Sequence, residues 1–168
     1  MKDMKKELSE QDALFRLTTL CSQAEHCSWE MTEKMRQWGI SPEAQARIMQ
    51  YLTNEGYIDE TRYCRAFVRD KIKHNKWGRR KVEQALMAKR ISRDIYLPVL
   101  NETDDADYIE VLRGLLKSRR RQLGAMSDYE QRGRLVRYAM SRGFTFDIIR
   151  QCLDVDDLDM EEGDNDDD

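Results

Sequence analysis

A short junction recurs three times in the chain, and its spacing constrains the fold more than any other feature. Each copy leads from the end of an amphipathic stretch, through a turn and one apolar residue, to a Ser or Thr that can cap the next helix. The apolar residues are Ile40, Ile91 and Phe144, which lie 51 and 53 residues apart. Residue identity between the copies is low, so the period itself predicts tandem modules that stack mainly on their neighbours.

Apolar periodicity predicts helix through almost the whole chain, because only two prolines occur and no run alternates strictly between apolar and polar residues. Ser41 precedes Pro42, and Ser127 opens a capping box with Glu130, so each marks a helix start. Further cap candidates are Ser28, Asp59, Ser92 and Thr145. We predict an all-α fold with helices at residues 10–25, 28–38, 42–55, 60–75, 79–90, 92–100, 104–121, 128–141 and 146–153.

Grouping these helices in threes predicts the domain organisation. Residues 1–57 form the first three-helix repeat with a short N-terminal extension, residues 58–102 a second, basic repeat, and residues 103–153 a third. Because contacts in such an array are local, we expect an elongated molecule. Residues 154–168 are predicted to be a disordered acidic tail, since ten carboxylates and no cation in fifteen residues repel one another.

The charge of the second repeat is concentrated in one segment. Between Arg62 and Arg93 there are twelve Lys and Arg residues against two carboxylates, a net charge of +10, although the whole chain carries only −3. So dense a positive segment predicts an anionic partner. The candidate partner-binding residues are Arg62, Arg65, Arg69, Lys71, Lys73, Lys76, Trp77, Arg79, Arg80 and Lys81.

The first helix of this repeat is expected to have two faces. At about 100° per residue, the side chains of Arg62, Arg65, Arg69 and Lys73 share a narrow arc, opposite Tyr63, Cys64, Phe67 and Val68. Like charges at i, i+4 each cost about 0.2–0.5 kcal/mol in an isolated helix, so this arc weakens its own helix unless a negative partner faces it. The alternative is an ordinary solvated face.

The aromatic residues allow packing and binding roles. Trp77, among four cations at a turn, either packs between modules or stacks on a base or partner. A packing role is predicted for Phe15, Trp29, Trp38, Tyr51, Tyr57, Tyr138 and Phe144. Arg113, Lys117 and Arg119–Arg121 form a second basic patch, which either binds a partner or is neutralised by acidic neighbours within the chain.

Several function classes find no support in the sequence. It contains no phosphate-binding glycine loop, nucleophile elbow or His-Glu-x-x-His motif, so neither enzymatic activity nor a cofactor is predicted. Cys21, Cys27, Cys64 and Cys152 include no Cys-x-x-Cys pair, so we expect free thiols rather than a metal site. No apolar run is long enough to span a bilayer and the start lacks a signal-peptide pattern, so a cytoplasmic location is predicted.

Over residues 12–153 the chain resembles the RecX family, bacterial regulators of the RecA recombinase. The matching elements, in order, are Gly56–Glu60, Arg62-Tyr63, Ala66–Arg69, Lys76–Gly78, Lys81-Val82 and Leu86–Ile91. The chain departs from the family pattern at Arg79, where members often have Pro, and at Arg90, where they often have Gly; both changes add charge.

The resemblance implies a fold and a function. The implied fold is a curved, elongated monomer of three three-helix repeats. The implied function belongs to DNA repair, homologous recombination and the SOS response: binding of the RecA–DNA filament and suppression of its ATPase, coprotease and strand-exchange activities. Two alternatives remain open from the residues, a helical module that binds single-stranded nucleic acid directly and a structural adaptor whose charge is merely solvated.

Overall fold

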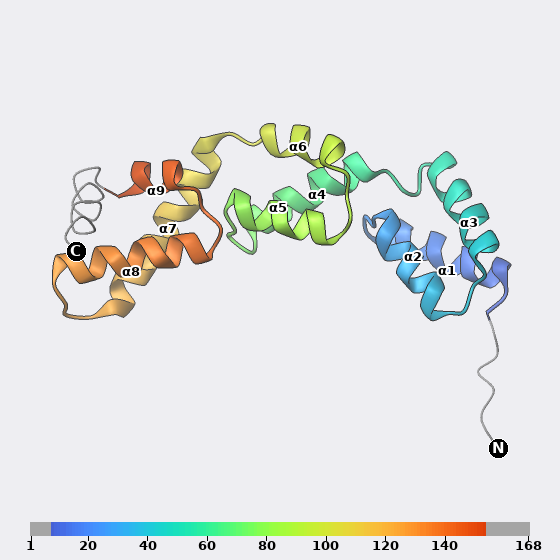
Figure 1. Cartoon of the computed structure of the whole chain (residues 1–168), viewed down its shortest axis with the longest axis horizontal. Coiled ribbons are helices and arrows are strands. Elements are labelled where there is room, and N and C mark those ends of the chain that lie inside the picture. Colours follow the sequence, from blue (N-terminus) through green and yellow to red (C-terminus); the bar gives the residue numbers. More distant parts are fainter. Residues whose placement is uncertain (1–7, 154–168) are drawn as a thin grey trace, which may run out of the picture. The chain divides into compact units, whose positions relative to one another are not determined.

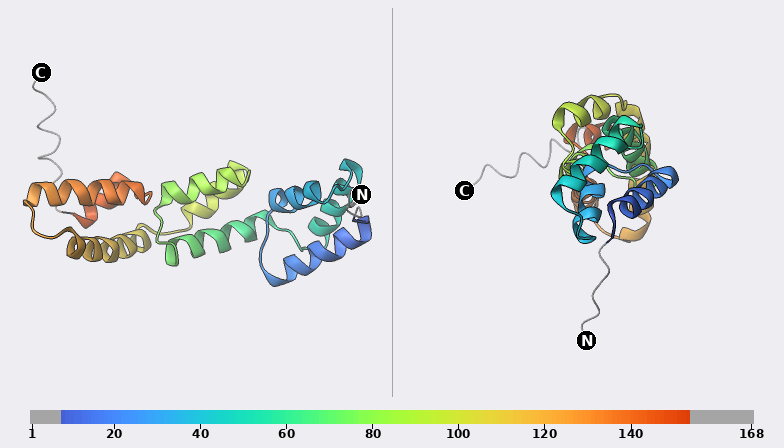
Figure 2. Two further views of the ribbon diagram at one scale, coloured as in Figure 1. Left: turned by 90° about the horizontal axis from the view of Figure 1, so that it is seen from below. Right: turned by 90° about the vertical axis from the view of Figure 1, so that its right-hand side faces the viewer.

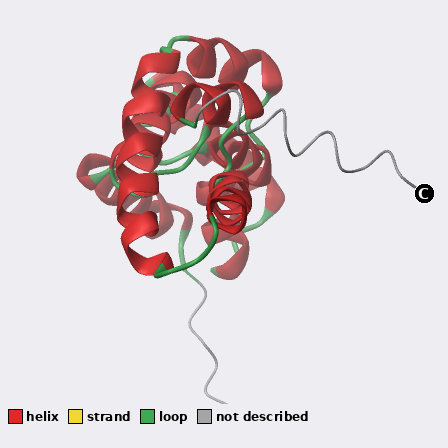
Figure 3. Cartoon of the chain, turned by 90° about the vertical axis from the view of Figure 1, so that its left-hand side faces the viewer, coloured by secondary structure: helices red, strands yellow, loops and turns green. Residues whose placement is uncertain are grey.

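The structure, a computed structural model, describes residues 8–153, and within them every regular element is a helix (Figures 1 and 3). The predicted all-α fold is confirmed, and each predicted helix start lies within one residue, and each end within two, of the observed bound. The helices are α1 (Glu10–Gln23), α2 (Ser28–Gln37), α3 (Pro42–Asn54), α4 (Glu60–Lys73), α5 (Arg79–Ala88), α6 (Arg93–Asn101), α7 (Asp105–Leu123), α8 (Asp128–Ser141) and α9 (Phe146–Cys152).

Side-chain caps explain where most of these helices begin. The hydroxyls of Ser41, Ser127 and Thr145 accept hydrogen bonds from the backbone N–H three residues later, as does the carboxylate of Asp59. At α2 the prediction of a Ser28 cap is wrong, because Cys27 precedes the helix and the Glu30 carboxylate accepts from the Cys27 N–H at 3.2 Å. Glu30 thus makes the reciprocal bond of a capping box around Cys27, and Ser28 is the first residue of the helix.

The three recurring junctions share one backbone structure, the Schellman motif that ends many helices. The N–H groups of Ile40, Ile91 and Phe144 donate to the carbonyls five residues earlier at 3.0, 3.3 and 3.1 Å. Each of these side chains is buried, with exposed fractions of 7%, 4% and 1%. The residue before each one has a positive φ, and in the middle copy that residue is Arg90. The period found in the sequence therefore reflects the same turn conformation at three positions.

The described chain forms two compact units, and the division between them runs through the second repeat. One unit comprises the residues up to Phe67 together with Leu86–Tyr96. In it, α3 packs against both α1 and α2. The core of the first repeat consists of Ala13, Leu17, Met31, Met35, Ile40, Ala44, Ile48, Leu52 and Ile58.

The other unit comprises Val68–Ala85 and the residues from Leu97 onward. In it, α7 packs against α8 and α9, which are drawn in orange and red (Figure 2). The Cys152 thiol donates to the carbonyl of Ile109 at 3.7 Å, which ties the end of α9 to α7. The buried side chains of this trio are Tyr108, Leu112, Leu116, Leu135, Val136, Ala139, Phe144, Ile148, Ile149 and Leu153.

Within this unit, the start of α5 meets the turn between α8 and α9 backbone to backbone. The Gly78 N–H donates to the Arg142 carbonyl at 2.8 Å, and the Arg80 N–H donates to the Gly143 carbonyl at 3.0 Å. A Cβ on Gly78 would overlap the backbone of Gly143 and Phe144, and one on Gly143 would lie 2.6 Å from the backbone nitrogen of Lys81. We call this pair, Gly78 and Gly143, the glycine clasp, because only the absence of both side chains permits the approach.

Two aromatic predictions are wrong. Phe15 is 73% exposed and Tyr51 is 43% exposed, although both were expected in the core. Tyr51 instead stacks on Tyr57 with ring centroids 6.2 Å apart, and Phe15 lines an open hollow with Leu20 and Trp38. By contrast, Phe144 is almost completely buried, as predicted.

Candidate anion-binding interface

The ten candidate residues fall on both compact units. Arg62 and Arg65 belong to the first, and the other eight belong to the segment Val68–Ala85 of the second. Arg62, Arg65, Arg69, Lys73, Lys76 and Arg80 are exposed, whereas Lys71, Trp77, Arg79 and Lys81 are half-buried.

The expected two-faced character of α4 is confirmed by its burial pattern. Of the predicted apolar face, Tyr63, Cys64 and Val68 are at most 6% exposed and Phe67 is half-buried, while Ile72, 5% exposed, extends this face. The cations at the predicted arc point to solvent. Burial raises the pKa of the Cys64 thiol to about 11 and, with Glu30 and Cys27 nearby, raises that of Tyr63. The buried face is therefore uncharged at neutral pH.

Two of the ten residues are held by partners within the chain. Arg62 Nε donates to Glu25 at 2.5 Å, and its guanidinium also donates to the Gly56 carbonyl at 2.9 Å. Arg79 donates to the side-chain oxygen of Asn101 at 2.6 Å and to the Leu100 carbonyl. In both cases the guanidinium links a helix start to another segment, so part of its hydrogen-bonding capacity serves the fold.

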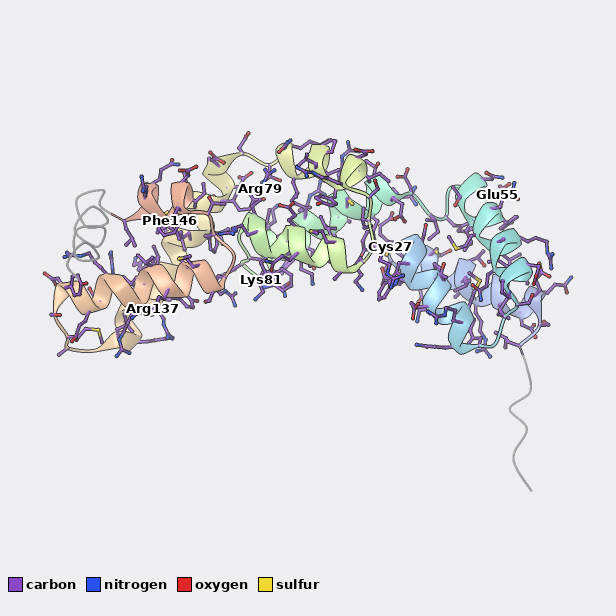
Figure 4. All side chains as sticks on the ribbon, in the orientation of Figure 1. Cys27, Glu55, Arg79, Lys81, Arg137 and Phe146 are labelled. Carbon is purple, nitrogen blue, oxygen red and sulfur yellow. The ribbon has the colours of Figure 1, made fainter. Side chains whose placement is uncertain are left out.

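Trp77 is flanked by lysines of its own unit. The ammonium groups of Lys71 and Lys81 lie 5.3 and 4.8 Å from the centroid of its ring, within the range of a cation–π contact. The backbone N–H of Trp77 donates to the Lys71 carbonyl at 3.1 Å, which closes the turn after α4. The indole therefore fixes two cations beside the turn, and Figure 4 shows Lys81 and Arg79 leaving the start of α5 on opposite sides.

Four of the ten candidate residues make no ion pair with any residue in 8–153. They are Arg69, Lys73, Lys76 and Arg80, and all four are exposed. The nearby carboxylate of Asp70 lies 3.8 Å from Lys71 and 4.0 Å from His74 instead. We call these four residues, together with Lys71 and Lys81 beside Trp77, the cationic surface. Its chemistry suits an anionic partner, since its six positive charges outnumber the carboxylates of the same segment, Asp70 and Glu83.

The structure also brings Arg134 and Arg137, which sequence reasoning did not select, close to Arg119, which it did. Arg134 and Arg137 of α8 line a hollow with Arg119 of α7, Tyr138 and Ser141. Their spacing of three residues on one helix face was the available signal, but the burial of neighbouring Leu135 and Val136 was needed to show which face is open.

Metal binding and membrane insertion find no support in the part of the chain that the structure describes. No group of three or more His, Cys, Asp or Glu side chains in residues 8–153 is arranged to hold a metal ion. The Cys27 thiol donates to Glu30, and burial raises its pKa to about 12, so it is a poor nucleophile. None of the described helices combines the length and the apolar character needed to cross a membrane.

Family models identify the chain through its second and third repeats. The model of the second three-helix domain of RecX matches residues 59–96, and that of the third matches residues 105–153. Together the two matches cover just over half of the chain. The chain belongs to the RecX family. This confirms both the resemblance and the tandem arrangement of three-helix repeats.

Curated relatives carry the same family name. Regulatory protein RecX of Lactobacillus johnsonii is 28% identical over 163 residues, which are 97% of this chain and 59% of the relative. Regulatory protein RecX of Halorhodospira halophila is 27% identical over 152 residues, which are 90% of this chain and 91% of the relative. The chain therefore spans about three fifths of the first of these RecX proteins and most of the second.

Solved RecX structures share the fold. The crystal structure of RecX from Lactobacillus salivarius superposes with a TM-score of 0.78 at 18% identity, covering 90% of this chain and 97% of that one. A second crystal structure of a regulatory protein RecX gives a TM-score of 0.79 at 17% identity, covering 85% and 72% of the two chains. At such low identity, the likeness to these RecX structures establishes the fold alone.

Proposed function

We propose that this chain inhibits a RecA-type recombinase by binding the recombinase–DNA filament and restraining its ATP hydrolysis, coprotease activity and strand exchange. Membership of a family of regulatory proteins supports the regulatory role. The filament presents DNA phosphates and protein carboxylates, either of which a dense positive surface attracts. The binding residues in this proposal are those of the cationic surface, and the chain acts without catalysis of its own.

One observation carries the choice of surface. Arg69 and Lys73 repel each other across one turn of α4, and neither forms an ion pair with another described residue. The Arg69 and Lys73 charges therefore add nothing to the stability of the fold. Arg62 and Arg79, in contrast, stabilise it through their internal hydrogen bonds. The unpaired cations are therefore the ones that a partner would neutralise.

The direct test is DNA-dependent ATP hydrolysis by the cognate recombinase, titrated with this protein. We expect Arg69→Glu with Lys73→Glu to raise the concentration needed for half inhibition by at least about tenfold, since each reversal replaces attraction by repulsion. The matched control is Arg36→Glu with Arg47→Glu on the first repeat, which changes the net charge equally and disrupts only exposed ion pairs.

Two outcomes would contradict the proposal. Unchanged inhibition by the Arg69 and Lys73 variant would favour a solvated, purely structural face. Equal losses in the test and control variants would indicate a response to net charge alone. The competing module that binds bare DNA through Trp77 predicts a larger loss for Trp77→Ala, but the ring already contacts Lys71 and Lys81.

A further inference from the structure

A second positive surface lies on the third repeat, outside the cationic surface. Between Arg113 and Arg142 the chain carries nine cations and two carboxylates, a net charge of +7. Three of these arginines, Arg119, Arg134 and Arg137, line a groove of about 340 Å3 with Tyr138 and Ser141. No carboxylate lines this groove, which we call the arginine groove, and Figure 4 marks Arg137 on α8.

Arg119 is fixed in position before any ligand arrives. Its guanidinium lies 5.0 Å from the centroid of the Tyr138 ring, and one terminal nitrogen donates to the Gln122 side chain at 3.2 Å. Its Nε is buried without a hydrogen-bond partner in the described part of the chain. A guanidinium held against an aromatic ring loses little further freedom on binding an anion, which raises affinity.

Arg134 and Arg137 extend the positive track along α8. Both are exposed, and neither forms an ion pair with another residue in 8–153. They also line an adjoining hollow of about 230 Å3 with Tyr129, Glu130 and Gly133. The two hollows share these arginines, so an anionic ligand longer than one group can contact all three guanidinium groups.

The groove suits a chain of phosphates better than a compact ligand. It is open and shallow, whereas small-molecule sites enclose most of their ligand. Its charged residues are all arginines, whose planar forks match phosphate oxygens in pairs. Arg119 lies over the Tyr138 ring, so the ring face turned toward Arg119 is not available for stacking on a base. Binding through phosphates alone would be independent of base sequence.

We propose that the arginine groove binds the phosphodiester backbone of single-stranded nucleic acid, as a contact separate from the cationic surface. This places strand binding on the third repeat rather than around Trp77. It is independent of the proposed inhibition, because the groove can hold a bare strand whether or not a recombinase is present.

The test uses the full chain, a fluorescent oligothymidylate of about 20 nucleotides and no recombinase. We expect Arg134→Gln with Arg137→Gln to weaken binding by about tenfold at low salt. The plot of log affinity against log salt concentration should become shallower by about 1.4, because two phosphate contacts are lost. An oligonucleotide of mixed sequence should bind with the same affinity as the oligothymidylate.

The matched control is Arg120→Gln with Arg121→Gln, two exposed arginines of α7 that line neither hollow. Equal weakening by both pairs of substitutions would overturn the proposal, as would an unchanged affinity for the groove variant. A poly-glutamate competitor that displaces the strand as well as an oligonucleotide of equal charge would also overturn it. Loss of inhibition with strand binding intact would count against the proposed function alone.

Discussion

Two basic residues, Lys76 and Arg90, adopt the left-handed backbone conformation, with φ of 57° and 56°. The turn at Arg90 has no glycine, yet it keeps its Schellman hydrogen bonds and buries Ile91. The caps at Ser41 and Asp59 were predictable because their chemistry is local. The cap of α2 was not, because the residue before the helix is Cys27, which is a rare N-cap residue, and its N–H donates to Glu30.

Replacing Arg90 with glycine should stabilise the protein. Glycine adopts positive φ without the steric cost that other residues pay, so the free energy of unfolding should rise by about 0.5–1 kcal/mol. Thermal unfolding followed by circular dichroism measures this as a melting temperature about 2 °C higher. The reverse change at the matching turn, Gly39→Ala, should lower it, since that site has open space but a φ of 73°. A less stable Arg90→Gly variant would show that the arginine side chain contributes more than its strain costs.

At the scale of helices, the start of α2 joins segments that are distant in sequence. The backbone N–H of Ser28 donates to Glu60 at 2.7 Å, and Lys89 lies 3.8 Å from Glu30 and 5.4 Å from the Trp29 ring centroid. Helix periodicity predicted each helix but not these junctions. It also misplaced Phe15, because an amphipathic pattern shows which face is apolar and not whether a neighbour covers it.

Glu30→Gln should destabilise the protein at neutral pH and much less in acid. Burial raises the pKa of this carboxyl, but the Cys27 N–H and thiol, Lys89 and His26 outweigh it and hold the pKa below its ordinary value. A lowered pKa stabilises the fold above the unfolded pKa, and the contribution is lost as pH falls through the folded one. At pH 7 we expect a loss of about 1–2 kcal/mol, measured by urea unfolding.

The control for this prediction is Glu33→Gln on the same helix, which removes only an exposed pair with Arg36 and should change stability little. The difference between wild type and Glu30→Gln should shrink as the pH falls below 4.5. A stability difference that stays constant down to pH 3 would mean that the glutamine side chain packs less well, and that loss of the negative charge is not the cause.

At the scale of the whole chain, charge is distributed along the sequence in opposite blocks. The second repeat carries +10 between Arg62 and Arg93, and residues 154–168, which lie outside the described residues, carry −10. Composition alone predicted this division. It did not predict that the third repeat would present its own arginine groove, since that requires α7 and α8 to lie side by side.

Deletion of residues 157–168 should tighten binding to the recombinase filament at low salt. If the chain binds the filament as proposed, we expect the acidic run to compete with it for the basic residues, so removal of the run should lower the dissociation constant by about three- to tenfold. The difference should vanish at high salt, where exposed charges are screened. Fluorescence anisotropy with a labelled filament measures both constants, and equal affinities at low salt would refute the competition.

The glycine clasp limits which repeats can replace the third repeat of this protein. A third repeat grafted from another protein would dock here only if it had glycine at the position of Gly143, because a Cβ there would overlap Lys81, however well its own core folded. A side chain at either position would require the opposing backbone to shift, and side chains at both would add a second overlap to the first.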